Sequence, residues 1–444
     1  MKKQSVPAAR ELALKILQAI ETQNSSANLL ILEVYQKYPL SPQDKALLKE
    51  LVNGVLRLRL KLDWVLNYLT GQRLKKTHPA VLNILRLGAY QLLFLKGITP
   101  YAAVNESVTL ARRYGYPGSN NLVNAVLRKI STLKALPALP AWEENPVLNI
   151  SVDYSHPEWL IRRWIKRWGV EKTKQICAGN NQPAITAFRV NTLKTTLAGC
   201  QERLLQENIV TAPHISISGA LEVVSGVDFV CSRAYQDGCI EIQSPCSQSV
   251  GQVLDPKPGQ RVLDLCAGRG VKSTHLAQLM QNQGWIEAID INSDKLRQNQ
   301  ANCRRLGINT VHGLCADAAV ALPIASGQKY DRILIDAPCS GLGVLGRYPE
   351  ARWYKSPELI DKMPVSQGKL LAQAAPYLAN DGVLVYATCS LEEEENEQVI
   401  EGFLKTHPGW QSAPIITDGK ACNYWHSWTQ KDFSDGFFVA KLTR

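Results

Sequence analysis

The strongest constraint on the fold is an alternation of strand and helix patterns that starts near Gln260 and continues to the C-terminus. Short apolar runs alternate with longer amphipathic ones. We expect strands at 261–266, 285–291, 310–315, 332–335, 383–387 and 437–442, and helices at 275–280, 293–306 and 370–378. Such alternation is typical of a doubly wound α/β domain with a mostly parallel sheet.

The N-terminal part of the chain lacks this alternation and favours helices alone. Leu12, Ile16 and Ile20 repeat at helical spacing, and Ser41 before Pro42 is a good helix start. Pro-punctuated sequence follows, then a mixture of short strands and helices. We expect a helical domain at 1–135, a linker at 136–150, a small α+β subdomain at 151–243 and the α/β domain at 244–444.

Two local patterns near the domain boundaries predict helix starts. Ser155 to Glu158 has the form of a capping box, which predicts a helix that runs through Trp168. Glu392 to Glu395 is expected to form the acidic first turn of a helix capped by Ser390, an arrangement that suits the helix dipole.

The charge of the chain is divided unevenly. Residues 1–150 hold 20 Lys and Arg against 9 Asp and Glu, whereas residues 151–444 hold 30 of each, so the net charge of +11 comes from the first part. A basic region of this kind favours docking on a polyanion, with nucleic acid the first candidate. The alternative is a basic surface that serves solubility alone.

The cysteines and the apolar runs exclude several classes of protein. Eleven cysteines, an odd number without any Cys-x-x-Cys pair, indicate neither a disulfide framework nor a zinc site, and we expect no metal. No targeting segment is recognisable, and no apolar run is long enough to cross a bilayer. We expect a cytoplasmic protein, a monomer, without a membrane partner.

Four acidic residues stand where strands should end, and ligands of doubly wound sheets bind there. They are Asp264, Asp290, Asp317 and Asp336. The turn after Asp264 is glycine-rich, but Ser273 stands where a dinucleotide fingerprint needs its third glycine. Asp290 suits the hydroxyls of a ribose, and Asp317 suits an adenine amino group. Each alone is as easily a cap or turn residue, but their order predicts S-adenosylmethionine.

Two cysteines follow strands that should end at the same pocket. Cys339 lies in Asp336-Ala-Pro-Cys-Ser-Gly, and Cys389 follows Ala387-Thr. A thiolate that adds to C6 of cytosine makes C5 nucleophilic enough to accept a methyl group, and a second group must help release the product. A carboxylic acid at N3 of the base would assist by supplying a proton, and the nearby Lys272 would lower a thiol pKa. Single cysteines are more often structural, but this pair indicates C5 methylation.

These motifs resemble those of the Nol1/Nop2/Sun family of RNA cytosine-C5 methyltransferases, and the resemblance covers nearly the whole chain. The most specific are Asp336-Ala-Pro-Cys-Ser-Gly, Arg347-Tyr-Pro-Glu-Ala-Arg-Trp353, and Thr388-Cys-Ser followed by Glu395-Asn-Glu. Residues 6–130 are similar to the family's NusB-like RNA-binding domain. The resemblance implies an α/β Rossmann-like S-adenosylmethionine methyltransferase domain, an N-terminal all-α NusB-like domain and a small α+β middle subdomain.

The resemblance also implies residue roles. Cys389 would be the covalent nucleophile, Cys339 would assist product release, and Asp336 would contact the base. The cofactor would lie against Cys266, Ala267, Gly268, Arg269, Gly270, Val271, Lys272, Asp290, Asp317 and Asp336.

The cofactor turn departs from the family pattern. The family usually reads Cys-Ala-Ala-Pro-Gly-Gly-Lys where this chain has Cys266-Ala-Gly-Arg-Gly-Val-Lys272. A β-branched residue tolerates positive φ poorly, so we expect the close backbone approach at Gly268 and Gly270 and not at Val271.

The implied substrate is a cytosine of small-subunit (16S) rRNA. Two alternatives stay open on the sequence. One is a tRNA cytosine-C5 methyltransferase, because catalytic residues read the base and not its surroundings. The other is a non-catalytic RNA-binding factor in ribosome assembly. The altered cofactor turn supports this second alternative.

Overall fold

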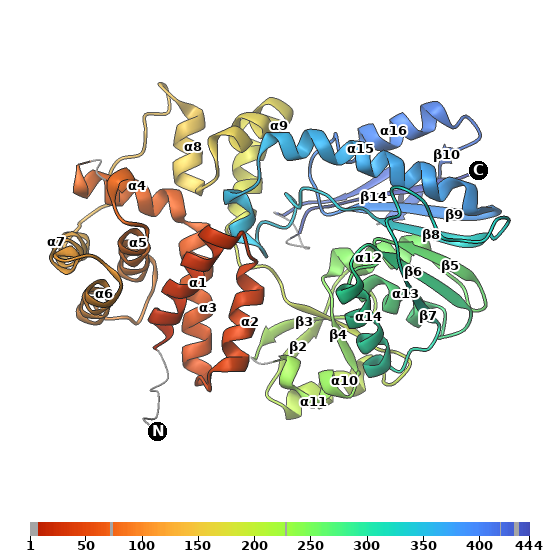
Figure 1. Ribbon diagram of the computed structural model, residues 1–444, viewed down its shortest axis with the longest axis horizontal. Coiled ribbons are helices and arrows are strands. Elements are labelled where there is room, and N and C mark those ends of the chain that lie inside the picture. The colour runs from red at the N-terminus through yellow and green to blue at the C-terminus, as the bar shows by residue number, and fades with distance from the viewer. Residues whose placement is uncertain (1–7, 72–73, 227–228, 418, 430–434) are drawn as a thin grey trace. The chain divides into compact units, whose positions relative to one another are not determined.

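The structure is a computed structural model that describes residues 8–71, 74–226, 229–417, 419–429 and 435–444. The chain forms two compact units (Figure 1). Unit 1 consists of residues 1–182 and 345–355, and unit 2 consists of residues 183–344 and 356–444. None of the helices described is both long and apolar enough to cross a membrane.

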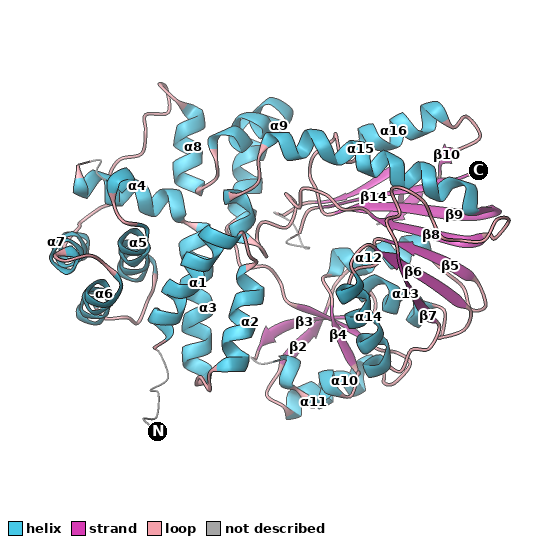
Figure 2. Ribbon diagram, viewed as in Figure 1, coloured by secondary structure: helices cyan, strands magenta, loops and turns pink. Residues whose placement is uncertain are grey.

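The described part of unit 1 is helical throughout, which confirms the prediction for the N-terminal region (Figure 2). Ser41 caps α3 as expected, because its hydroxyl accepts the N–H of Asp44 at 3.1 Å. A single apolar core, which includes Leu12, Leu51 and Leu85, lies between the first seven helices. The helices are α1 (Ala9–Gln23), α2 (Ala27–Lys37), α3 (Pro42–Arg57), α4 (Arg59–Thr70), α5 (Pro79–Phe94), α6 (Pro100–Tyr114), α7 (Ser119–Ser131), α8 (Pro146–Tyr154) and α9 (Glu158–Asn180), with a short 3-10 turn at Leu74–Lys76.

The predicted capping box at Ser155 is wrong. Ser155 ends α8 in the left-handed conformation, with φ of 56°, and its hydroxyl accepts the N–H of Leu60 at 2.9 Å. Pro157 precedes α9 without a side-chain cap, and α9 continues past Trp168 through a kink at Gly169 to Asn180. Of the predicted linker, residues 136–145 carry no helix or strand, whereas Pro146 begins α8.

The segment 345–355 belongs to unit 1 although its neighbours in sequence belong to unit 2. Its 3-10 turn, Pro349–Trp353, buries the Arg352 side chain completely. The guanidinium donates to the carbonyl oxygens of Ser155 and Asn180, both at 3.1 Å, and to Asn181 Oδ1 at 2.8 Å. Because these hydrogen bonds offset part of the cost of burying the guanidinium, Arg352 holds the segment against the ends of α8 and α9.

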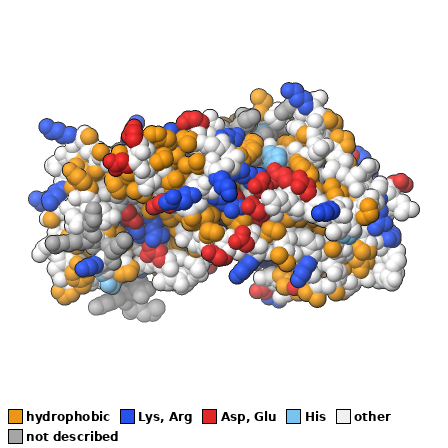
Figure 3. Space-filling model, turned by 90° about the horizontal axis from the view of Figure 1, so that it is seen from above, with side chains coloured by type: hydrophobic (Ala, Val, Ile, Leu, Met, Phe, Trp, Pro, Cys, Tyr) orange, Lys and Arg blue, Asp and Glu red, His pale blue; other side chains and the backbone are white. Residues whose placement is uncertain are grey.

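The basic charge of unit 1 does not gather into one surface on the face seen in Figure 3. Among the residues described on that face, Lys and Arg side chains occur singly and in small groups, with acidic and hydrophobic side chains between them. Some basic side chains of unit 1 are paired with acidic ones, as Arg113 is with Glu11 at 2.8 Å. The described residues on this face therefore form no continuous basic surface for a polyanion.

Unit 2 begins with a small α+β fold. Its four antiparallel strands lie in the order β2-β3-β1-β4, and their core contains Phe188, Leu204 and Leu221. The elements are β1 (Ala187–Val190), α10 (Leu197–Gln206), β2 (Val210–Pro213), β3 (Ala220–Ser225), η2 (Phe229–Cys231), α11 (Arg233–Gln236) and β4 (Ile240–Ile242).

The larger part of unit 2 is the predicted doubly wound sheet, in the order β10-β14-β9-β8-β5-β6-β7, with β13 beside β14. The five strands from β9 to β7 run parallel, and β14 is antiparallel to β9. The strands of this sheet are β5 (Arg261–Leu265), β6 (Trp285–Asp290), β7 (Val311–Cys315), β8 (Tyr330–Asp336), β9 (Leu378–Thr388), β10 (Gln411–Ser412), β13 (Tyr424–Ser427) and β14 (Phe437–Thr443). A separate antiparallel pair consists of β11 (Ile415–Thr417) and β12 (Lys420–Cys422).

Helices cover both faces of this sheet (Figure 1). Leu263 and Ile333 point into the layer under α15 and α16, whereas their neighbours Val262 and Leu334 point into the layer under α12 and α13. This alternation is what a sheet buried on both faces requires. The helices are α12 (Pro245–Leu254), α13 (Val271–Leu279), α14 (Ser293–Leu306), α15 (Pro357–Ala374) and α16 (Glu397–Thr406).

Two expectations about these helices are wrong. α15 starts at Pro357 and not at residue 370, because Pro364 lies inside the helix without ending it. α16 starts at Glu397 with Asn396 as its cap, so Glu392 to Glu395 form a turn before the helix and not its first turn. The acidic turn therefore has another role.

Candidate active site

The glycine turn lies at the carboxyl end of β5, where the order of strands reverses. β5 has β6 on one side and β8 on the other, and in such sheets this switch point is where ligands bind. Cys266, Gly268 and Gly270 have φ of 63°, 58° and 81°, so the chain turns sharply before α13 begins at Val271. As expected, the positive φ values fall on Gly268 and Gly270 and not on Val271, which begins α13, whereas the close approach of a cofactor to these glycines stays a prediction.

Replacing Gly270 with alanine is expected to lower both stability and cofactor affinity. A Cβ there would lie 2.0 Å from Asn299 Oδ1, and the positive φ adds about 1–2 kcal/mol of strain. We expect a total loss of about 2–4 kcal/mol in the free energy of unfolding. Gly268→Ala is the matched control, because its Cβ would meet nothing nearer than 4.0 Å. Denaturant unfolding and calorimetric titration with S-adenosylmethionine measure both effects, and equal losses in the two variants would contradict the argument from Asn299.

Two aspartates fix this turn. Asp264 is fully buried at the end of β5, and one of its oxygens accepts the hydroxyl of Ser273 at 2.6 Å. Burial raises the pKa of Asp264 to about 7, against the effect of that hydrogen bond. Asp290, at the end of β6, accepts the N–H of Gly268 and that of Asn292, both at 2.8 Å.

The turn and its aspartates fit a nucleoside cofactor. Asp264 Oδ1 is buried and receives no hydrogen bond within the described residues, so a polar acceptor is left over beside the turn. Gly268 leaves space for close approach to the backbone, because a Cβ there would meet nothing nearer than 4.0 Å, whereas Asn299 fills the space beside Gly270. Asp317 is exposed after β7, where its carboxylate accepts the N–H of Ala319 at 2.9 Å.

Arg269 is exposed in the same turn. Among the described residues no cluster of His, Cys, Asp or Glu has the composition of a metal site.

Lys272 links the cofactor turn to the cysteines. Its ammonium lies 2.7 Å from Asp336 Oδ2 at the end of β8. Burial acts to lower the pKa of Lys272, but the attraction of Asp336 and then of Cys389 holds it above its ordinary value. Lys272 therefore carries its charge, and the influence of Cys389 shows that this thiol lies within electrostatic reach.

The side chains of the two cysteines singled out in the sequence lie in direct contact. Cys339 follows β8, Cys389 follows β9, and their sulfur atoms are 3.4 Å apart. Both side chains are half-buried. Two thiols at this distance share a hydrogen bond, so a proton is readily held between them. The sequence-predicted catalytic residues Cys339, Cys389, Asp336 and Lys272 thus gather at the carboxyl ends of adjacent strands.

Several residues around the site were not predicted. Arg189, buried on β1, donates to Val271 O at 2.8 Å and Thr274 Oγ1 at 3.0 Å, which anchors the start of α13 to the small sheet. Glu395 accepts hydrogen bonds from both cysteine loops. Nothing in the sequence indicated the partners of Glu395.

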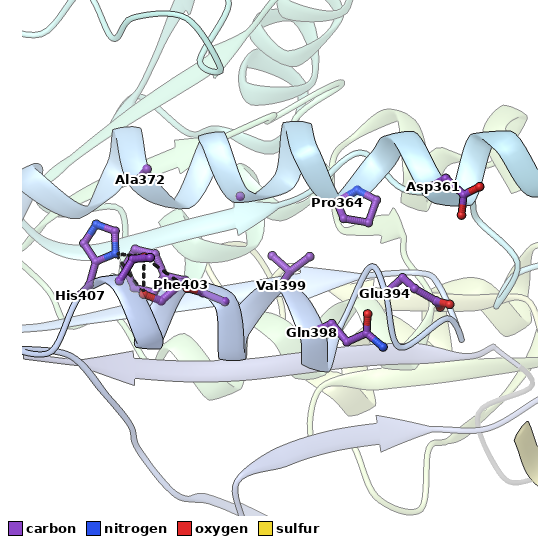
Figure 4. A pocket seen from close by; sticks show the side chains of 11 residues that line it. Asp361, Pro364, Ala372, Glu394, Gln398, Val399, Phe403 and His407 are labelled. Carbon is purple, nitrogen blue, oxygen red and sulfur yellow. Dashed lines mark hydrogen bonds between the residues drawn. The ribbon is translucent and has the colours of Figure 1, made fainter.

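A separate hollow of 480 Å³ lies between α15 and α16 (Figure 4). Pro364 and Ala372 of α15 face Val399 and Phe403 of α16, and Glu394 stands near one end. The described residues that line it include neither cysteine nor lysine. We therefore place the chemistry at the thiols and not in this hollow.

The fold and the cofactor turn together define an S-adenosylmethionine-dependent methyltransferase. The chain belongs to the 16S rRNA methyltransferase RsmB/F family, whose sequence model matches residues 251–443. The NusB family matches residues 7–132, and the ferredoxin-like domain of RsmF/B-like methyltransferases matches residues 156–229. These matches confirm the predicted family and fold class.

Known proteins resemble the whole chain. The chain is 33% identical over 456 residues to the "Probable ribosomal RNA small subunit methyltransferase B" of Bacillus subtilis (strain 168), with 100% of each chain covered. The crystal structure of PH0851 matches with a TM-score of 0.82 at 28% identity, and again 100% of each chain is covered. NSun6 from Pyrococcus horikoshii, solved with the S-adenosylmethionine analogue SFG, matches with a TM-score of 0.58 over 65% of this chain and 98% of its own. At 22% identity, this last match shows the fold alone.

Proposed function

We propose that the protein methylates C5 of a cytosine in 16S rRNA through a covalent adduct between Cys389 and C6 of the base. The observation that carries the proposal is the pair of sulfur atoms 3.4 Å apart, beside the ion pair of Lys272 and Asp336. A methyltransferase that acts on a nitrogen or oxygen atom has a lone pair to use and needs no thiol. Attack at C5 needs a nucleophile at C6 and a base to finish the reaction.

The cofactor would be held by the turn from Cys266 to Lys272 and by Asp290, with Asp317 and Asp336 at the neighbouring strand ends. When bound there, S-adenosylmethionine supplies the methyl group as a sulfonium methyl. The chain's contribution is orientation, since the turn and the two thiols follow β5, β8 and β9, adjacent strands of one rigid sheet.

Cys389 acts first in the proposed sequence. Its sulfur electron pair forms the S–C6 bond, and the C5=C6 π pair becomes available at C5. Negative charge spreads over the ring toward N3, where Asp336 would contact the base, and the ammonium of Lys272 would offset that charge. The base then carries the new methyl group and the original hydrogen on C5.

Cys339 completes the reaction. Its thiolate takes the C5 proton, the released electron pair restores the C5=C6 bond, and the S–C6 bond breaks. Cys389 leaves as a thiolate and Cys339 becomes a thiol again. Two thiols within hydrogen-bond reach suit this exchange, because one must be charged while the other holds the proton.

The choice of 16S rRNA rests on the relatives and on the helical N-terminal region. The Bacillus subtilis relative is named for the small ribosomal subunit, and residues 7–132 match the NusB family. The surplus of basic residues lies in the same region. Together these features support small-subunit rRNA as the substrate.

The test is methyl transfer from labelled S-adenosylmethionine to naked 16S rRNA, assembled small subunits and bulk tRNA. We expect label on one cytosine of the naked rRNA, recovered as 5-methylcytidine after digestion and mass spectrometry. Label only in tRNA would overturn the substrate and keep the chemistry. Tight RNA binding without any transfer would favour the non-catalytic assembly factor.

A further inference from the structure

A buried carboxylate joins the two loops that carry the cysteines. Glu395 is fully buried, and its Oε2 accepts the backbone N–H of Ser340 at 2.7 Å. Its Oε1 accepts the hydroxyl of Ser390, also at 2.7 Å, and Gln367 donates to Oε2 at 3.3 Å. All three partners are donors, which is the pattern that an ionised carboxylate requires. We call Glu395, Ser340 and Ser390 the Glu395 bridge.

The Glu395 bridge fixes the spacing of the thiols. Ser340 follows Cys339 directly and Ser390 follows Cys389, so each arm of the bridge holds the residue next to a thiol. The hydroxyls of Ser340 and Ser390 also meet each other at 3.1 Å. One side chain therefore sets the approach of two loops that are 50 residues apart in sequence.

The bridge also places a negative charge beside Cys339. The hydrogen bond with Cys389, then burial, then the charges of Cys389 and Glu395 all raise the pKa of the Cys339 thiol. The other titratable group packed against it is the Tyr386 phenol on β9, which is neutral because burial and Cys339 itself raise its pKa. The positive charge nearby belongs to Lys272, whose pKa is raised by Asp336 and by Cys389.

We propose that Glu395 is a positioning residue that keeps Cys339 protonated, as the hydrogen-bond donor to the Cys389 thiolate, until Cys389 has bonded to the base. The proposal rests on the C5 methylation proposed above. The proposal adds the order in which Cys339 loses its own proton and takes the C5 proton, which the distance between the thiols alone does not specify.

Every proton in the proposed cycle is accounted for. Before the reaction Cys389 is a thiolate and Cys339 is a thiol. When the sulfur of Cys389 bonds to C6, that sulfur loses its negative charge and no longer accepts a hydrogen bond. Cys339 therefore loses the hydrogen bond to Cys389, which is the largest of the effects that raise its pKa. Cys339 then gives that proton to solvent, which is the one proton that C5 methylation releases overall. Its thiolate takes the C5 proton as Cys389 departs, and both cysteines return to their starting states.

The first experiment measures the charge of each thiol without RNA or cofactor. The full-length protein is treated briefly with iodoacetamide at several pH values, and mass spectrometry quantifies alkylation of Cys339 and Cys389. We expect Cys389 to react first in the wild type. In Glu395→Gln, which keeps the size of the side chain and removes its charge, the ratio of alkylated Cys339 to Cys389 should rise about tenfold. Glu394→Gln, a change in the hollow of Figure 4, is the control and should leave the ratio unchanged.

The second experiment tests the coupling between the thiols. In Cys389→Ala the midpoint pH for alkylation of Cys339 should fall by about one unit relative to the wild type. This comparison stays informative if Glu395→Gln does not fold. An unchanged ratio in folded Glu395→Gln would overturn the role of Glu395, and an unchanged midpoint in Cys389→Ala would overturn the hydrogen bond by which Cys389 holds the proton on Cys339.

The outcome is separable from that of the proposed function. A shifted alkylation ratio without methyl transfer to any RNA supports the Glu395 bridge and overturns C5 methylation. Methyl transfer to cytosine C5 with an unshifted alkylation ratio supports C5 methylation and overturns the role of the Glu395 bridge. If both hold, single-turnover release of the adduct in Glu395→Gln should depend on pH differently from the wild type, whereas Glu394→Gln should match it.

Discussion

Cys389→Ala is expected to abolish methyl transfer while leaving cofactor binding intact. Without the nucleophile at C6, C5 of cytosine is too weak to accept a methyl group, and we expect turnover to fall by roughly 10⁴-fold or more. The cofactor turn follows β5 and does not depend on this side chain, so the affinity for S-adenosylmethionine should stay within about twofold. Filter-bound label and calorimetric titration measure the two quantities.

A matched control is available among the other thiols. Cys231 is exposed on η2, away from the strand ends, and Cys231→Ala should retain full turnover. Turnover of Cys389→Ala within tenfold of the wild type, with correct folding, would remove the basis for a covalent mechanism.

Cys339→Ala is expected to trap the protein on its RNA. Cys389 can still add to C6 and C5 can still be methylated, but the group that takes the C5 proton is missing. Release should slow by about 10²–10⁴-fold, so a covalent protein–RNA complex accumulates. Denaturing gel electrophoresis with labelled RNA measures it. The double variant Cys339→Ala/Cys389→Ala should form no such complex, and a complex that persists in it would show that another residue makes the bond.

Much of the fold followed from local patterns. Six strands of the doubly wound sheet lie where their apolar runs predicted them, although β9 starts before the predicted residue 383 and the short strands β10 and β13 were not predicted. α14 occupies the predicted residues 293–306. α14 was predictable because Asn292 caps its start and Gly307 ends it. α15 was not, because Pro364 reads locally as a break, while in the fold the turns on both sides of it remain helical.

The reactive groups of the candidate site were predictable from the sequence, but the residues that hold them in position were not. Asp290, Asp336, Cys339 and Cys389 stand at strand ends, and the topology of parallel strands brings such ends together. Glu395 was interpreted as a charge for a helix dipole, because its partners Ser340 and Ser390 are fixed only by the tertiary fold. Contacts between segments this far apart leave no periodic signal in one sequence.

The segment 345–355 has a consequence for how the protein is made. A ribosome finishes α1 to α9 well before it reaches Arg352, because β1 to β8 come between them in the chain. Until then the carbonyls of Ser155 and Asn180 lack their guanidinium donor, and the helical unit lacks a buried piece of its own interior. The nascent N-terminal unit thus completes its packing only after the loop with Cys339 has emerged, which ties maturation of the helical unit to synthesis of the catalytic one.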